Sequence, residues 1–126
     1  MKSGKFDTPI DFTPDLLIDN YHIQYIGLHE IAQGSPVVGY LCINENRING
    51  YRFGGPFLFE YPHLYIPALQ RSSFVITRID LKNNSIAFIG SLMNYICLEK
   101  LENDRIYYYA DLENKTLCYL QISHFC

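Results

Sequence analysis

The chain has 126 residues, of which 48% are hydrophobic and 18% are charged, and its formal net charge is −3. This length is enough to bury one core but too short for two ordinary domains, so we expect a single β domain over residues 1–126. The negative net charge argues against a nucleic-acid partner, because binding to phosphates needs clustered Lys and Arg. No run of residues suits a secretory signal or a membrane-spanning helix, so we expect a cytoplasmic protein with no membrane partner.

The N-terminal residues predict an extended segment followed by one short helix. Residues 1–12 carry no periodic pattern and are expected to be extended. Thr13 suits the N-cap of a helix and Pro14 suits its first position. A short helix is therefore predicted over Asp15–Asp19, with Asn20 able to close it.

The next stretch predicts a strand and then a hairpin. Residues 21–26 alternate as in a β-strand that ends at Gly27, after which residues 28–32 suit either a continuation beyond a bulge or one turn of helix. Two further strands, Val37–Ile43 and Arg47–Phe53, flank the polar break Asn44–Asn46 and predict a hairpin.

A strong turn and a proline-containing segment follow. Residues 54–56 read Gly-Gly-Pro and predict a turn, and Phe57–Glu60 predicts a short strand. The next segment, Tyr61–Pro67, has prolines at both ends of an aromatic run. Proline cannot donate a hydrogen bond to a neighbouring strand, so this segment is predicted to lie at a sheet edge or to cross between sheets.

The C-terminal half predicts five consecutive strands. They are Phe74–Lys82, Ser85–Gly90, Met93–Lys100, Arg105–Leu112 and Thr116–Ile122. Three of the four connections are short and polar, as in an antiparallel meander. The predicted fold class is therefore mainly β, an antiparallel meander forming a β-sandwich or a small open barrel, with one short N-terminal helix.

The two-residue period of a strand assigns side chains of this half to opposite faces. In Phe74–Lys82 it places Val75, Thr77, Ile79 and Leu81 inward. In Arg105–Leu112 it places Ile106, Tyr108, Ala110 and Leu112 inward and Arg105, Tyr107, Tyr109 and Asp111 outward. The two outward tyrosines either form a contact surface for a partner or pack as cross-strand pairs within the sheet.

No combination of residues indicates catalysis or a cofactor. The four histidines lack the spacing of a metal site, and no Gly-rich phosphate loop is present. Of the four cysteines, Cys42, Cys97 and Cys118 lie in apolar strand runs, and we expect these and Cys126 to be reduced. We therefore expect no metal, no cofactor and no enzymatic activity.

The largest electrostatic feature is an excess of acids near the N-terminus. Between Phe6 and Asn46 there are six Asp or Glu residues and no Lys or Arg. Such an asymmetry favours either a basic partner or simple solubility. A small, acidic, tyrosine-rich β protein suits a protein-binding module, and most specifically an immunity-type inhibitor that neutralises a basic, nuclease-like toxin domain.

The residues expected to bind that partner are acidic or aromatic. They are Asp11, Asp15, Asp19, Glu30, Glu45, Tyr107, Tyr109 and Asp111. One alternative function is a small-ligand-binding or enzymatic β-barrel with a pocket lined by Phe57, Tyr61 and Tyr65. Another is a structural module that associates with itself.

Overall fold

The computed structural model describes residues 3–6, 15–18, 21–30, 37–54, 57–60, 62–71, 73–102, 104–110 and 115–122. Every regular element in these ranges is a β-strand, and all strand pairs are antiparallel. The strands are β1 (Ser3–Phe6), β2 (Asp15–Ile18), β3 (Tyr21–Glu30), β4 (Val37–Ile43), β5 (Asn46–Phe53), β6 (Phe57–Glu60), β7 (His63–Gln70), β8 (Ser73–Asp80), β9 (Ser85–Phe88), β10 (Cys97–Glu102), β11 (Arg105–Tyr109) and β12 (Leu117–Gln121). The prediction of a mainly β, antiparallel fold is confirmed.

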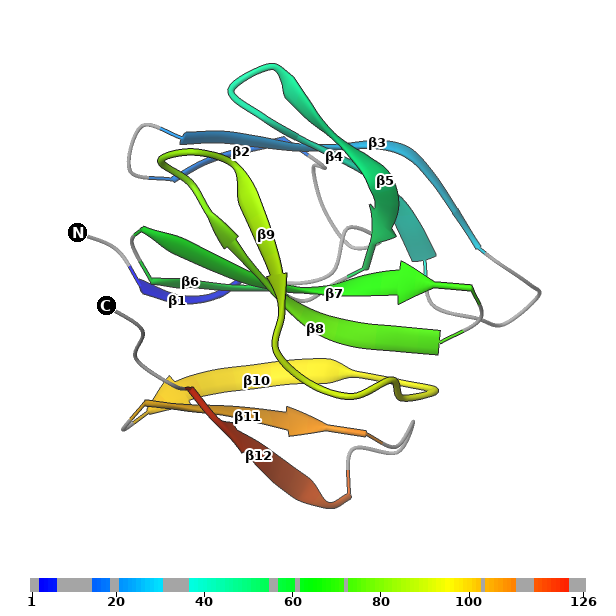
Figure 1. Ribbon diagram of the computed structural model, residues 1–126, viewed down its shortest axis with the longest axis vertical. Coiled ribbons are helices and arrows are strands. Elements are labelled where there is room, and N and C mark those ends of the chain that lie inside the picture. The colour runs from blue at the N-terminus through cyan, green and yellow to red at the C-terminus, as the bar shows by residue number, and fades with distance from the viewer. Residues whose placement is uncertain are drawn as a thin grey trace.

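The strands form two sheets that are arranged in three layers (Figure 1). The nine-stranded sheet folds back on itself, so that β2–β5 lie over β1, β6, β7 and β8, and β9 leans up from β8 towards them. The second sheet, β10–β11–β12, lies on the other side of this middle layer. The architecture is layered and does not close into a barrel.

Two cores separate the three layers. The first lies between β2–β5 and the middle layer and includes Phe53, Phe57 and Phe59, all fully buried. The second lies mainly between the middle layer and the small sheet and includes Ile76 and Leu98. The middle layer therefore has apolar side chains on both of its faces, as expected for strands covered on both sides.

Strand β7 is central, so the prediction that residues 61–67 cannot form a central strand is wrong. One edge of β7 pairs with β8 along its whole length, and its other edge is shared by β6 and β5. The Gly54 N–H donates to the Pro67 carbonyl at 2.9 Å, so the Pro67 nitrogen also faces this shared edge. That is where the partner changes from β6 to β5. The missing N–H is thus tolerated, and the β8 ladder is unaffected.

The predicted N-terminal helix is absent, because Asp15–Ile18 forms β2 and pairs with the first four residues of β3. A five-residue helix cannot stabilise itself, since isolated helices shorter than about 12–15 residues are marginal in water. Pairing with β3 satisfies the same backbone groups in the sheet. Within the predicted extended segment, Ser3–Phe6 forms β1 and pairs with β6, and the rest of that segment lies outside the described residues.

The region from β3 to β5 follows the predicted pattern closely. Strand β3 continues to Glu30, with a register shift between Ile26 and His29. Of the two predicted alternatives, residues 28–30 therefore continue the strand beyond a bulge and do not form a helical turn. The β4–β5 hairpin is confirmed, and it turns on Asn44 and Glu45 with φ of 50° and 70°. Positive φ at both central residues is the conformation that matches the twist of a two-residue hairpin.

The five predicted C-terminal strands are all present, with partly shifted bounds, but they do not form one meander. Strand β9 pairs with β8, whereas β10, β11 and β12 pair only with one another. The connection 89–96 therefore passes from the middle layer to the small sheet. The predicted inward set of β8, Val75, Thr77, Ile79 and Leu81, is buried. Phe74 and Ile76 on the opposite face are buried as well, under the small sheet.

Three cysteines, Cys42, Cys97 and Cys118, are free thiols, as predicted, and Cys126 lies outside the described residues. No helix in the described ranges is long and apolar enough to cross a membrane.

The two cores predict that the small sheet is needed for the stability of the whole fold. Leu98 is fully buried in the second core, so Leu98→Ala should lower the free energy of unfolding by about 2–5 kcal/mol. Leu92→Ala, at an exposed site in the connection to β10, should change it by less than about 0.5 kcal/mol. Urea denaturation followed by circular dichroism measures both. Equal midpoints for the two variants would contradict the arrangement.

Candidate functional site

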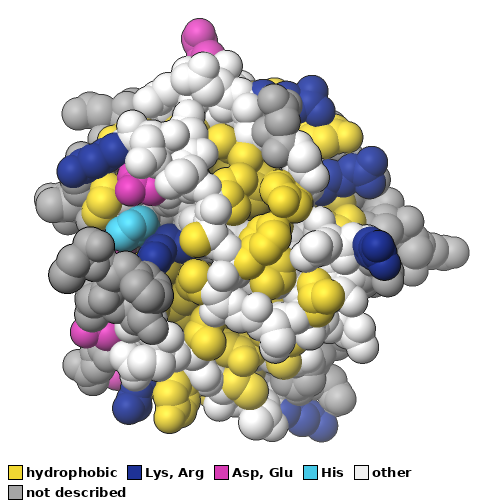
Figure 2. All heavy atoms as spheres, viewed as in Figure 1, with side chains coloured by type: hydrophobic (Ala, Val, Ile, Leu, Met, Phe, Trp, Pro, Cys, Tyr) yellow, Lys and Arg dark blue, Asp and Glu magenta, His cyan; other side chains and the backbone are white. Residues whose placement is uncertain are grey.

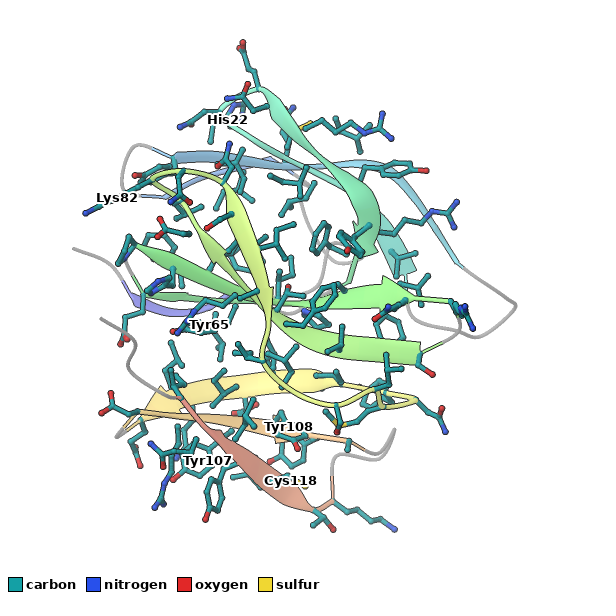
Figure 3. The ribbon with its side chains drawn as sticks, viewed as in Figure 1. His22, Tyr65, Lys82, Tyr107, Tyr108 and Cys118 are labelled. Carbon is teal, nitrogen blue, oxygen red and sulfur yellow. The ribbon has the colours of Figure 1, made fainter. Side chains whose placement is uncertain are left out.

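The outer face of the small sheet presents two tyrosines on β11. Ile106 is fully buried and Tyr108 packs against the second core, whereas Tyr107 and Tyr109 point the other way and are half-buried. Tyr107 and Tyr108 are both marked on β11 in Figure 3. The predicted faces are therefore confirmed for these residues. Ala110 follows the end of β11 and is exposed, so its predicted inward orientation is wrong.

Tyr107 lies opposite a third tyrosine, Tyr119 on β12, and their ring centroids are 6.0 Å apart. Tyr119 was not among the predicted site residues, although alternation along Leu117–Gln121 would have placed it on the outward face of its strand. Tyr119 is 54% exposed and Leu117 on the same strand is 43% exposed. The tyrosines thus form a cross-strand pair and still leave a large aromatic surface in contact with solvent.

Cations lie over both rings of this pair. The ammonium nitrogen of Lys100 on β10 is 5.0 Å from the Tyr107 ring centroid, and the guanidinium carbon of Arg105 is 4.5 Å from that of Tyr119. Arg105 also donates to the side-chain oxygen of Gln121 at 3.3 Å. These contacts place a cation against each ring on the surface of the sheet. We call Lys100, Arg105, Tyr107, Leu117, Tyr119 and Gln121 the tyrosine face.

Exposed apolar side chains extend beyond the tyrosine face. Figure 2 shows hydrophobic side chains gathered in a band down the middle of the molecule, over β9, the connection 89–96 and β12. Phe88, Leu92, Leu117 and Tyr119 are the exposed large hydrophobic residues of these segments. Contiguous apolar surface of this kind typically marks a contact region for another molecule.

The predicted acidic residues lie in other layers. Asp15 is in β2, Glu30 ends β3, and Glu45 is exposed in the β4–β5 turn, all on the side of the middle layer opposite β11 (Figure 1). Asp11, Asp19 and Asp111 lie outside the described residues. The segments that carry the predicted acids Asp15, Glu30 and Glu45 therefore lie in a different layer from the tyrosines, and the charged groups over the rings of Tyr107 and Tyr119 are cations.

Phe57 and Tyr65 do not line a common pocket, contrary to what the alternative function expected. Phe57 is fully buried in the first core and Tyr65 is buried in the second, so the two lie on opposite faces of the middle layer. Tyr61 lies outside the described residues.

A row of ionisable side chains crosses one end of the middle layer. His63 on β7 is registered with Glu60 on β6 and with Asp80 on β8. Burial lowers the pKa of His63, and the nearby Arg78 cation adds to this, while Asp80 and Glu60 act in the opposite direction. Arg78 also hydrogen-bonds Tyr65, whose pKa is raised by burial. Each polar group here has an opposite charge or a hydrogen bond beside it, as in a structural network.

Metal binding finds no support in the described part of the chain, where no group of three or more His, Cys, Asp or Glu side chains is placed to hold an ion. Comparisons of the chain with protein-family models, with curated proteins and with solved structures found no significant match. The geometry of the surface is therefore the basis for any functional inference.

The environment of His63 predicts a specific loss of stability in acid. Because its folded pKa lies below the ordinary value of 6.5, the unfolded chain binds the proton more readily. The contribution of His63 to the free energy of unfolding is complete above about pH 6.5. It is lost as the pH falls through the pKa that His63 has in the folded protein. His63→Gln should therefore lose less stability than the wild type between about pH 7 and pH 5.5 in thermal melts. Parallel curves for the two proteins would contradict this assignment.

Proposed function

We propose that this chain is a protein-binding module and that the tyrosine face makes the contact. The observation that carries the proposal is the exposed Tyr107–Tyr119 pair, held in place by Lys100 and Arg105 on a sheet face that no other described element covers. Tyrosine offers a large rigid area and a hydroxyl group at a small entropic cost, which is why it is frequent among the residues that anchor interfaces.

Within this class we propose an immunity-type inhibitor that neutralises a basic, nuclease-like toxin domain in the cytoplasm. The support is the net charge of −3 and the absence of Lys and Arg between Phe6 and Asn46. Because the described acids of β2, β3 and the β4–β5 turn lie away from the tyrosine face, their proposed part is to attract the partner during association. The tyrosine face then determines how long the complex lasts.

Removing a tyrosine of the pair should speed dissociation of the partner. With a basic toxin domain encoded beside this chain as the partner, Tyr119→Ala or Tyr107→Ala should weaken binding by about 2 kcal/mol, roughly thirtyfold in Kd, mainly through the dissociation rate. Ile26→Ala on β3 is the control, because Ile26 is, like Tyr119, an exposed large hydrophobic residue but lies in another layer. Surface plasmon resonance measures both rates. If both tyrosine variants dissociated from the partner at the wild-type rate, the tyrosine face could not be the contact surface.

Reversing charge in the acidic region should act on association instead. The double variant Asp15→Lys with Glu45→Lys should slow association by roughly tenfold at low salt and flatten its salt dependence, with little change in dissociation. Measurements at two ionic strengths separate this effect from a loss of contacts, because added salt screens attraction between exposed charges. An unchanged association rate in a folded variant would show that the acids serve solubility only.

A further inference from the structure

A cleft of about 530 Å³ lies beside the β4–β5 hairpin and the β7–β8 turn, remote in sequence from the tyrosine face. Its walls include Tyr40, Arg47, Tyr51, Arg52, Leu69 and Arg71, and we call it the arginine cleft. Figure 2 shows Lys and Arg side chains gathered along the edge of the molecule where β4, β5 and the β7–β8 turn lie. All three arginines are exposed, so the cleft is open to solvent.

The cleft exists because β5 carries more residues than the part of β4 that it faces. Only Tyr40 separates the paired residues Gly39 and Leu41 on β4, whereas residues 49–52 separate their partners on β5. The extra residues form an irregular bulge opposite Tyr40. Gly50 within this bulge has φ of 96°, a conformation that other residues rarely adopt. A side chain built at Gly50 would meet nothing within 4 Å, which shows how open the bulge is.

Strand pairing then brings the third arginine to the same place. Arg52 is registered with Leu69 of β7, two residues before Arg71 in the tight β7–β8 turn. Arg71 has φ of 62° and is exposed. Three cations that are up to 24 positions apart in the chain thus border one cleft.

Two of these cations share a single tyrosine. The guanidinium carbon of Arg47 is 3.9 Å from the Tyr40 ring centroid and that of Arg52 is 5.7 Å from it. The pKa of Tyr40 is lowered, mainly by the hydrogen bond and the charge of Arg52 and to a smaller extent by the charge and the hydrogen bond of Arg47. Each guanidinium has five N–H donors, so one phenol cannot satisfy both groups. No carboxylate of the described residues lines the cleft, so none of them separates the like charges there.

We propose that the arginine cleft binds a small organic phosphate, with the phosphate among Arg47, Arg52 and Arg71 and the organic part against Tyr51 and Leu69. The planar donor fork of arginine matches phosphate oxygens, and a doubly charged anion suits a cluster of cations better than a single carboxylate does. The volume is that of an ordinary small-molecule site, and Tyr51 with Leu69 supplies its apolar wall. Three cations at one cleft are too few for a nucleic-acid track. This proposal is independent of the protein-binding role.

The probe is phenyl phosphate, added to the full chain and followed by NMR chemical shifts and calorimetry. Saturable binding is expected, and Arg47→Gln or Arg52→Gln should weaken it by about tenfold or more. Arg71→Asn should also weaken it. This variant leaves the contacts of Arg47 and Arg52 with Tyr40 in place, and Asn tolerates the positive φ of position 71. Lys82→Gln removes the same charge at an exposed site outside the cleft and should leave the affinity within about twofold, as expected for a screened distant charge.

Two comparisons decide the outcome. Inorganic phosphate should bind more weakly than phenyl phosphate, because it cannot use the Tyr51 and Leu69 wall. Equal affinities for the two probes would overturn the assignment of an organic phosphate. Absence of saturable binding, or equal weakening by Lys82→Gln and by the three arginine variants, would overturn the site itself.

Discussion

Strand β7 is the element on which the other layers depend. It pairs with β5, β6 and β8 and is buried on both faces, so it contributes to both cores at once. The buried Thr77 hydroxyl strengthens this centre by donating to the Ile66 carbonyl at 2.6 Å, across the β7–β8 pair. One edge of β7 is taken entirely by β8, so β6 and β5 must share the other edge, and Pro67 lies where β6 gives way to β5. The proline is therefore compatible with the centre of the sheet.

Much of the fold was predictable because it follows local rules. Turn residues such as Asn44 and Glu45 located the hairpins, and the two-residue period identified one of the two buried faces of β8 and the buried face of β11. The errors arose where distant pairing overrode a local signal. Thr13 and Pro14 suggested a helix, but the residues after them gained more by pairing with β3. The prolines of residues 61–67 suggested an edge, and the division of one edge of β7 between β6 and β5 explains why Pro67 lies in a central strand.

The candidate surfaces show the same limit. Alternation placed Tyr107 correctly and would have found Tyr119 had it been applied to β12, but strand pairing was needed to bring the two rings together. The segments that carry Asp15, Glu30 and Glu45 lie in a different layer from the tyrosines. This could not be predicted, because composition along the chain says nothing about which layer a strand joins. The arginine cleft had no sequence signal, since Arg47 and Arg52 meet Arg71 only through a bulge in β5 and its pairing with β7.

Net charge is therefore a poor guide to the local chemistry of this chain. It carries 13 acids against 10 lysines and arginines, yet its cleft is lined by arginine and the rings of Tyr107 and Tyr119 have cations over them. The two cationic places differ in what their charges already contact. On the tyrosine face Lys100 and Arg105 lie over different rings, Arg105 also hydrogen-bonds the Tyr107 side chain, and Lys100 pairs with Glu102 at 3.7 Å. In the cleft two guanidinium groups share Tyr40 and a third has no described acid beside it. Repulsion among like charges is strongest where no counter-charge is built in, so an incoming anion gains most at the cleft.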